Sequence, residues 1–458
     1  MTGIIKEQPR QTPVVDECDV CIVGGSCTGT FAAIRAAQAG ADVCLLENNG
    51  YLGGMATAGL VPIWHSPHDT VGSRQIIAGL TTEVTDRLDR RAAVMTNPEP
   101  GNAEWGWRLN PYELEIELDE MVREAGVTVR LHTRFVDVVM RDGTASAVII
   151  EDKTGRRAIR AKAFVDATGD GDLLVRAGLG TRRLGDLQPP TMVAVLRGLE
   201  EVKRRDPDFN LSRVVHDSKY PEALKRGFLW GTQLPSLPEL YMVAGTRAHD
   251  ADCSNADELT AASIETRRQV RAICDILRRH IAGGEGVALA GLGNMIGIRE
   301  TRHADCLHTL TEKEVLEGRR FEDAIANGSY RVDVHHSERS GLTFRYLDGR
   351  EEYVEPGIPR QPGRWRDPMP AGQEEPTFYQ IPYRCLVPRG ARNILTAGRL
   401  IDSDRGAFGA IRVMVNCNQT GEAAGLAAAM AADSGCSVED VHARRLRNTL
   451  KKMGAIIF

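Results

Sequence analysis

Side chains of the kinds that enzymes use in catalysis gather between residues 299 and 336. Arginine binds anions and stabilises developing negative charge, and histidine moves protons near neutral pH. We therefore treat Arg299, Arg302 and His335 as candidate catalytic residues. The full polar set comprises Arg299, Glu300, Arg302, His303, His308, Asp333, His335 and His336.

Two other interpretations of this polar segment stay open. In the first, the arginines are surface charges and the histidines are hydrogen-bonded polar residues. In the second, histidines and carboxylates bind a metal, but the segment lacks H-E-x-x-H or any other tight ligand spacing, so the sequence predicts no metal. Elsewhere, Cys18 and Cys21 form a C-x-x-C. Because Cys21 falls inside a predicted strand and no second pair follows, we expect no metal or redox role for them.

A glycine-rich turn near the N-terminus predicts a nucleotide site. Residues 18–48 read CDVCIVGGSCTGTFAAIRAAQAGADVCLLEN, a buried strand, a tight turn, an alanine-rich helix and a second strand that ends in Glu47. The G-x-G-x-x-G fingerprint falls on Gly24, Ser26 and Gly29, and Glu47 has the spacing of a ribose-binding acid. A serine in the middle still lets the backbone approach a pyrophosphate at the helix N-terminus. A plain structural β-α-β unit is the alternative; a serine nucleophile elbow is not, because the next glycine comes one residue too late.

Three later segments favour FAD over NAD as the nucleotide. NNGYLGGMATAGLV places Gly53 and Gly54 just beyond the second strand, where NAD enzymes have no particular need of glycine. FVDATGDGD, residues 164–172, is a strand that runs into A-T-G. NILTAGR near the C-terminus is a strand and a glycine-rich loop that precede an alanine-rich helix. Segments so far apart in the sequence point to one elongated ligand.

These motifs resemble the FAD-dependent oxidoreductase family, flavoproteins with two dinucleotide-binding domains, and more distantly the flavoproteins of fumarate reductase and succinate dehydrogenase. The resemblance covers nearly all of the chain. It rests also on GIRETRHADCLHTLTEKEVLEGRRFEDAIANGSYRVDVHH, IPYRCLVPRGARNILTAGRL and GAIRVMVNCNQTGEAAG. It implies an α/β fold, with a discontinuous Rossmann-like FAD-binding domain and an α+β substrate or cap domain.

The resemblance assigns the cofactor contacts residue by residue. Gly24, Ser26 and Gly29 would line the pyrophosphate, and Glu47 would bind the adenosine ribose. Gly53, Gly54 and Met55 would run past the pyrophosphate and the ribityl chain, Phe135 would touch adenine through its backbone, and further backbone contacts would come from Ala167, Thr168, Gly169, Gly398 and Arg399.

The resemblance also assigns a substrate-binding arginine. GAIRVMVNCN is similar to the fumarate reductase segment in which an arginine binds a substrate carboxylate beside the flavin, which makes Arg412 the matching position. The helix around Asn416 and Cys417 would aim its N-terminus at the flavin and stabilise the anionic reduced ring. Tyr383, adjacent to the C-terminal flavin segment, is a further proton-transfer candidate.

Two departures from the family pattern limit what it implies. No histidine precedes Gly53 where succinate dehydrogenases attach FAD covalently, so we expect non-covalent FAD. The middle of the chain also differs from that of fumarate reductase, so fumarate chemistry does not transfer.

The chain divides into an FAD-binding domain in two parts, 14–190 and 378–458, and a substrate or cap domain, 191–377. The cap domain ends in the proline-rich EPGIPRQPGRWRDPMPAGQEEP. Residues 257–281 predict an amphipathic helix, and the Phe, Met and Trp residues of this domain are expected in its core. VALAGLGNMIG, residues 287–297, hints at a nicotinamide site, but no amphipathic helix and no acid-ended strand follow it.

Composition and charge exclude several partners. The net charge of −5 offers no basic field for nucleic acid, and no apolar run approaches the ~18 residues of a membrane span. The N-terminus lacks the apolar core of a signal peptide, and ten scattered cysteines suit reduced thiols, so a cytoplasmic location is expected.

The sequence thus predicts an FAD-dependent oxidoreductase of the dehydrogenase or reductase type. It would exchange hydride between flavin N5 and a small organic substrate that carries a carboxylate. The alternatives are a monooxygenase fed by a separate reductase and an electron-transfer subunit of a larger complex. A homo-oligomer or an electron-transfer partner stays open.

Overall fold

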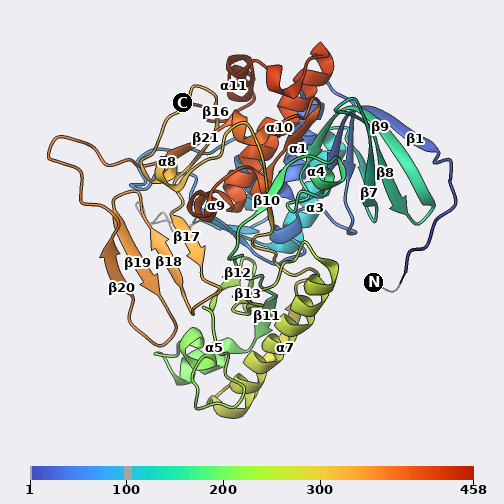
Figure 1. Ribbon diagram of the computed structural model, residues 1–458. Helices are drawn as coiled ribbons and strands as arrows, with labels where there is room; N and C mark the ends of the chain where they lie inside the picture. The colour runs from blue at the N-terminus through green and yellow to red at the C-terminus, as the bar shows by residue number, and fades with distance from the viewer. Residues whose placement is uncertain (1–2, 97–105) are drawn as a thin grey trace.

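A seven-stranded sheet forms the centre of the computed structural model, which describes residues 3–96 and 106–458 (Figure 1). The strands follow the order β6-β2-β1-β9-β8-β7, and β22 also pairs with β9. Their bounds are β1 Val14–Val23, β2 Val43–Leu46, β6 Thr128–Arg130, β7 Arg134–Arg141, β8 Thr144–Asp152, β9 Gly155–Asp166 and β22 Ile394–Thr396.

Strand β9 joins two kinds of pairing in this sheet. One edge of β9 lies parallel to β1 along residues 158–166, while the other edge pairs antiparallel with β8 at residues 155–160 and parallel with β22 at residues 164–166. Val165 is therefore flanked by Ile22 and Leu395, which come from opposite ends of the sequence. This topology confirms the predicted α/β fold and returns the C-terminal segment to the N-terminal nucleotide unit.

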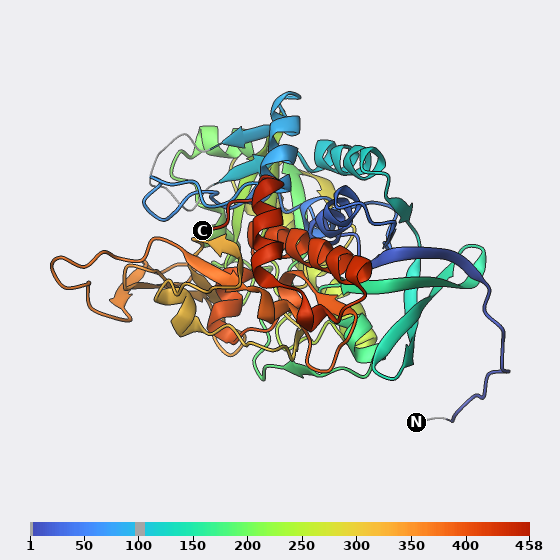
Figure 2. The same ribbon diagram turned by 90° about the horizontal axis from the view of Figure 1, so that it is seen from above.

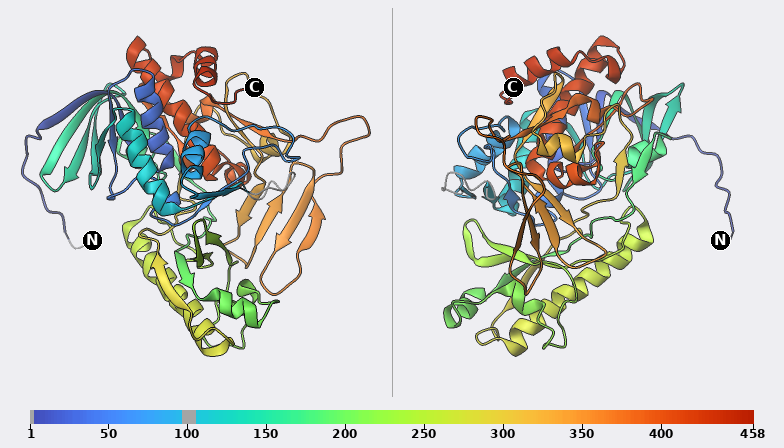
Figure 3. Two further views of the ribbon diagram at one scale, coloured as in Figure 1. Left: turned by 180° about the vertical axis from the view of Figure 1, so that it is seen from behind. Right: turned by 60° about the vertical axis from the view of Figure 1, so that its left-hand side comes forward.

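Helices α1 (Cys27–Gln38) and α10 (Met414–Ser434) cover the sheet and pack directly on each other, as Figure 1 shows at the centre of the molecule. Two glycines of α10 allow this approach, because a Cβ at Gly421 or Gly425 would overlap the backbone of α1. The remaining helices of this half are α2 Leu80–Asp89, α3 Pro111–Glu124, α4 Asp172–Arg176, α8 Glu312–Leu316, α9 Arg405–Ile411 and α11 Ala443–Lys452; α3 lies beside α1 (Figure 3).

A second sheet, β12-β13-β11-β14, builds the lower part of the molecule in Figure 1. The predicted helix forms as α7 (Ala256–His280), which Asn255 caps by accepting from two backbone N–H groups. Ile264 of this helix is 51% exposed, so it lies outside the buried face. The other elements here are β11 Val193–Arg197, α5 Leu199–Arg205, α6 Leu211–Val215, β12 Trp230–Leu234, β13 Leu237–Ala244 and β14 Ala288–Leu292.

The 287–297 glycine segment has a role other than a nucleotide turn. Strand β14 pairs antiparallel with β11, and the next element is a strand, β15 (Arg302–Ala304), rather than a helix. Gly297 then pairs with Thr191, and a Cβ at Gly297 would lie 2.8 Å from Met55 Cε. The segment therefore lacks the β-α-β context of a nicotinamide site and runs past Met55 instead.

A third sheet, β17-β18-β19-β20, projects from the opposite side to the N-terminal leader, as the view from above shows (Figure 2). Its first strand lies against α9, where Gly409 touches the backbone of Asp333. Smaller ribbons are β3-β5-β4, β10-β15 and β16-β21. The bounds are β3 Ile63–Trp64, β4 Val94–Thr96, β5 Trp107–Leu109, β10 Thr181–Arg183, β16 Ala324–Gly328, β17 Val332–His335, β18 Leu342–Arg345, β19 Arg350–Val354, β20 Gln361–Arg364 and β21 Tyr379–Pro382.

The domain boundaries stay a prediction. The hydrophobic core around α1 and α10 also takes in side chains from Leu310 to Val332, which the sequence assigned to the cap domain. Within the described ranges, none of the helices combines the length and apolar character that crossing a bilayer requires. The same ranges hold no group of three His, Cys, Asp or Glu side chains placed for a metal, and Cys18 and Cys21 are buried free thiols.

Candidate active site

The predicted nucleotide turn lies between β1 and α1. Gly24 has a φ of 106°, and a Cβ there would come within 2.6 Å of the Ala167 carbonyl oxygen. A Cβ at Gly29 would overlap the Gly24 carbonyl, so both positions need glycine. Ser26 is the N-cap of α1 but makes no capping bond, which leaves the N-terminal N–H groups of the helix open to an anion such as a pyrophosphate.

Glu47 stands at the end of β2 and faces this turn. One carboxylate oxygen accepts from the Gly25 N–H at 2.8 Å, and the other accepts from the backbone and side chain of Asn49, both at 2.7 Å. A carboxylate has about four lone-pair positions, so Glu47 can still accept from ribose hydroxyls. The Thr133 N–H donates to the Glu47 carbonyl at 2.9 Å and brings the start of β7, with Phe135, alongside.

The segment after β2 crosses the N-terminus of α1. Gly53 pairs with Ser26, and a Cβ at Gly54 would lie 3.0 Å from the Ser26 Cβ. Both glycines have positive φ, 95° and 56°, which favours glycine. Met55 follows and lines the pocket described below. The path fits the predicted run from pyrophosphate to ribityl chain.

The A-T-G segment is held by a buried carboxylate. Asp166 accepts from the Thr168 N–H at 3.0 Å, the Thr168 hydroxyl at 2.7 Å and the Leu174 N–H at 3.1 Å. Burial outweighs these hydrogen bonds and raises the pKa of Asp166 to about 6. The neighbouring loop is fixed by Asp170, which pairs with Arg399.

The C-terminal segment closes the site. The Gly398 N–H donates to Thr420 Oγ1 at 3.0 Å, and Arg399 donates to Thr301 Oγ1 at 3.2 Å while its guanidinium lies against Gly169. Helix α10 begins at Met414 with Val413 as its N-cap and no side-chain cap, and both residues line the pocket. Its positive N-terminal end therefore opens on the pocket.

The side chains of Asn416 and Cys417 turn away from the pocket into the core. Asn416 donates to the Tyr379 hydroxyl at 2.9 Å and to the Ala410 carbonyl at 3.2 Å. The Cys417 thiol donates to the Arg412 carbonyl at 3.4 Å. Any contact of these two residues with a cofactor would have to come from the backbone of α10.

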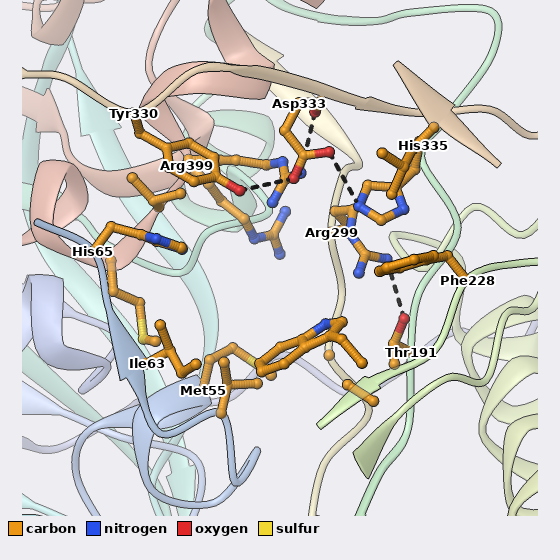
Figure 4. Close-up of a pocket in the computed structure, with 18 of the residues that line it drawn as sticks. Met55, Ile63, His65, Thr191, Phe228, Arg299, Tyr330, Asp333, His335 and Arg399 are labelled. Carbon is orange, nitrogen blue, oxygen red and sulfur yellow. Dashed lines mark hydrogen bonds and ion pairs between the residues drawn. The ribbon is translucent and has the colours of Figure 1, made fainter. Parts of the chain in front are cut away.

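A pocket of about 340 Å³ lies between the nucleotide half and the second and third sheets. Figure 4 shows an open centre with Met55, Ile63 and His65 on one side and Asp333, His335 and Arg299 on the other. Phe228, Trp230 and Phe344 also line it, which corrects the expectation that aromatic residues of the middle region are all core. Among the lining residues are five arginines but one carboxylate: Arg299, Arg331, Arg360, Arg399 and Arg412, with Asp333.

Asp333 contacts three other side chains on the polar side of the pocket, which we call the polar wall. Its Oδ2 accepts from the Tyr330 hydroxyl at 3.0 Å, and its Oδ1 lies 3.3 Å from His335 Nε2 (Figure 4). Oδ2 also accepts from Arg412 Nη2 at 3.0 Å. Burial alone would raise the pKa of Asp333, but the charges of Arg412 and Arg331, together with the contact to the His335 ring, outweigh burial and hold it well below its usual range. Burial and the Asp333 charge raise the pKa of Tyr330, which keeps its proton.

The buried Arg247 and the half-buried Arg299, which lines the pocket, meet beside this wall. Thr191 Oγ1 accepts from Arg247 at 2.7 Å and from Arg299 at 3.1 Å, so two cations share one hydroxyl. Burial lowers the pKa of Arg247 to about 10. Burial, Arg247 and Arg412 together lower the pKa of Arg299 well below its usual range. The charge of Asp333 does not offset the burial and mutual repulsion of these arginines, and an anion in the pocket would add the negative charge that does.

Two predicted candidates lie away from the pocket. Arg302 pairs with Asp172 at 3.2 Å and donates to the Asp170 carbonyl at 3.0 Å. Tyr383 is buried in the core and donates to the Val438 carbonyl at 2.7 Å. Neither lines the cavity, and both hydrogen-bond to the protein itself.

Sequence reasoning missed Tyr330, Thr191 and Arg247. The sequence did contain a pattern that places Asp333 and His335 together. The two residues are two positions apart on β17, and residues with this spacing point to the same face of a strand. Thr191 and Arg247 carry no such signal, since they meet only through the second sheet.

A second cavity of about 430 Å³ adjoins the first. Tyr330, Arg331 and Arg360 line both. The Arg331 guanidinium lies 3.8 Å from the centre of the Phe344 ring, and Arg360 pairs with Glu352 at 3.2 Å. The two spaces thus share a wall that contains two cationic side chains.

Comparison with known proteins gives a family model that matches residues 19–450, described as FAD dependent oxidoreductase. No curated protein matches the sequence. A solved geranylgeranyl bacteriochlorophyll reductase-like protein from Thermoplasma acidophilum is 12% identical over 95% of this chain and 84% of that one, with a TM-score of 0.45. The p-nitrophenol 4-monooxygenase PnpA from Pseudomonas putida DLL-E4 is 12% identical over 93% and 82%, with a TM-score of 0.46.

Proposed function

Because this chain belongs to the FAD dependent oxidoreductase family, with FAD as its cofactor, we propose that it oxidises or reduces a small organic substrate that carries a carboxylate. Bound FAD supplies the redox chemistry by exchanging hydride at N5. The protein supplies the binding of that substrate, its orientation and the movement of a proton.

The observation that carries the proposal is the charge of the pocket: five lining arginines and one carboxylate. Arg412 is the best placed to hold a substrate anion. Its Nη2 is bound to Asp333, while its buried Nε has no hydrogen-bond partner among the described residues. An unpaired buried N–H is costly, and a substrate oxygen would satisfy it.

The other walls suit the organic part of the substrate. Met55, Ile63, Phe228 and Trp230 give an apolar lining opposite and beside the arginines. Apolar walls exclude water, and charge interactions strengthen when water is excluded. A substrate with a carboxylate at one end and an apolar carbon skeleton matches this division.

The test is anaerobic mixing of the FAD-loaded protein with carboxylic acids and with their uncharged amides. Carboxylates alone should bleach the flavin absorbance. Arg299→Gln should raise KM for the active acid by about ten-fold or more, while the matched control Arg302→Gln, which lies outside the pocket, should leave it unchanged. Equal bleaching by amides, or equal effects of the two variants, would refute a carboxylate-binding pocket.

We also propose that the FAD is non-covalent. The residue before Gly53 is Leu52, a buried side chain with no nucleophile. Acid precipitation should release all the yellow colour into the supernatant as intact FAD. Colour retained in the pellet would mean a covalent link.

A further inference from the structure

His335 lies beside Asp333 and close to Arg299 and Arg247. Its side chain is buried, lines the pocket and presents Nε2 to Asp333 Oδ1 at 3.3 Å. Its backbone N–H donates to Gln188 Oε1 at 3.2 Å, which fixes the strand end that carries it. With the proton of the neutral ring assigned to Nε2, the nitrogen that lies beside Asp333, Nδ1 is the nitrogen that can take up a second proton.

The charged groups around His335 come from several elements. Its own strand supplies Asp333, and the segment after β14 supplies Arg299 (Figure 4). The end of α9 supplies Arg412. Arg247, after β13, adds positive charge from behind, and β18 places the apolar Leu342 opposite. Burial and the Arg299 charge outweigh Asp333 and lower the pKa of His335 well below its usual range, so without substrate the ring is neutral.

A bound anion would reverse this balance. A carboxylate on Arg299 and Arg412 cancels the positive potential that opposes charging of the ring, and it adds a negative charge to the same cavity. We propose that a substrate anion entering the pocket brings a proton onto His335. The idea rests on the proposed function, since it needs an anionic ligand in this pocket.

The proton balance is simple. Water or buffer gives up one proton, Nδ1 accepts it, and the Nε2–H stays directed at Asp333. The substrate brings one negative charge and the proton one positive charge, so the net charge of the pocket is unchanged. The proton then stands on the pocket wall, where it can be passed to the substrate or where the ring can hold the one that the substrate releases.

The experiment measures proton uptake when benzoate binds to the oxidised, FAD-loaded protein. Benzoate combines a carboxylate with a ring that suits the aromatic walls. A pH indicator in weakly buffered solution near neutral pH counts protons, and the shift of the flavin spectrum reports binding. We expect about one proton per benzoate, and a Kd that falls about ten-fold for each unit decrease in pH.

Two histidine variants test whether His335 is the group. His335→Asn and His335→Gln should bind benzoate without proton uptake and with a Kd that is flat with pH. The control His336→Asn should behave like the wild type, because His336 bonds Thr343 at 2.8 Å and does not line this pocket.

The outcomes distinguish proton uptake by His335 from the proposed carboxylate-binding function. Benzoate binding without proton uptake in the wild type, or uptake that persists in both His335 variants, overturns the role of His335 and leaves the anion pocket standing. Failure of both benzoate and succinate to bind at millimolar concentration overturns the carboxylate-binding function and this inference with it.

Discussion

At the scale of single residues, the chemistry of the pocket follows from how few negative charges it contains. Asp333 has to serve Tyr330, Arg412 and His335 at once. Asp402 and Asp404, the acids that most closely precede Arg412 in the sequence, do not pair with these side chains because both are bound elsewhere. Asp402 accepts from Arg182 and the Cys306 N–H, and Asp404 accepts from the backbone of Glu312 and Ala407. Arg412 therefore braces against one carboxylate and keeps an N–H for a ligand.

Arg412→Lys tests this directly. Lysine offers one point charge and cannot serve Asp333 and a substrate carboxylate together. We expect FAD to stay bound and kcat/KM, normalised to flavin, to fall about ten-fold or more, equivalent to about 1.4 kcal/mol of lost transition-state binding. Arg182→Lys is the matched control outside the pocket. Normal turnover with a lowered melting temperature would show that Arg412 only braces α9.

His335 also gives a prediction about stability and pH. Its pKa is depressed in the folded protein, whereas the unfolded chain titrates near about 6.5. As pH falls below about 6.5 the unfolded state binds the proton and the folded state does not, so stability is lost, by about 1.4 kcal/mol per pH unit. The free energy of unfolding, measured with urea between pH 7 and 5, should fall less steeply with decreasing pH for His335→Asn than for the wild type. The difference in slope should be about 1.4 kcal/mol per pH unit. Identical slopes would mean that His335 is charged in the folded protein.

Site residues could be predicted from the sequence where they stand in a recognisable local motif. Arg299, His335 and Arg412 stand in motif segments and do line the pocket. Arg302 belongs to the same segment as Arg299, yet it starts strand β15 and points to Asp172. The backbone between the two arginines is irregular, so their spacing does not set the relative direction of their side chains. Arg247 had no signal at all. Its role depends on three-dimensional proximity to Thr191.

At the scale of elements, two glycines in helices fix how close neighbouring segments can come. Gly409 of α9 lies against β17, where a Cβ would come within 2.8 Å of the Asp333 carbonyl oxygen and 2.9 Å of its nitrogen. Gly425 of α10 lies against α1. The β-α-β unit, the A-T-G strand and the C-terminal helix were predictable from the sequence because strand and helix periodicities are local. The close packing of these elements was not, because it joins distant segments.

Gly409→Ala and Gly425→Ala should therefore have different effects. Alanine favours a helix by up to about 1 kcal/mol over glycine, so any loss reflects overpacking, typically about 1–3 kcal/mol. Gly409→Ala should displace Arg412 and lower kcat/KM with FAD retained. Gly425→Ala should separate α10 from α1 and weaken FAD binding. Gly286→Ala, where no atom lies within 4 Å of the added Cβ, is the control. An equal loss of kcat/KM and of FAD affinity in all three variants would contradict these separate roles of Gly409 and Gly425.

At the scale of the whole molecule, the predicted FAD family and α/β fold are confirmed. The N-terminal turn between β1 and α1 has the complete β-α-β context, whereas residues 287–297 lie in an antiparallel sheet. We expect NADH and NADPH alone to reduce the flavin slowly, although dithionite bleaches it at once. Stopped-flow absorbance under anaerobic conditions measures this. Rapid bleaching by either nicotinamide at micromolar concentration would require a second nucleotide site.

The way α10 and β22 return to the N-terminal unit has a consequence for synthesis on the ribosome. Helix α1 is complete at Gln38, but the helix that covers it begins only at Met414. At about 5–20 residues per second, residues 39–413 take roughly 20–75 s to translate. During that time Thr28 and Ala32, which lie buried against α10 in the finished protein, have no α10 to cover them. We therefore expect the nascent chain to need the help of chaperones until α10 has been made, and FAD to bind only after that.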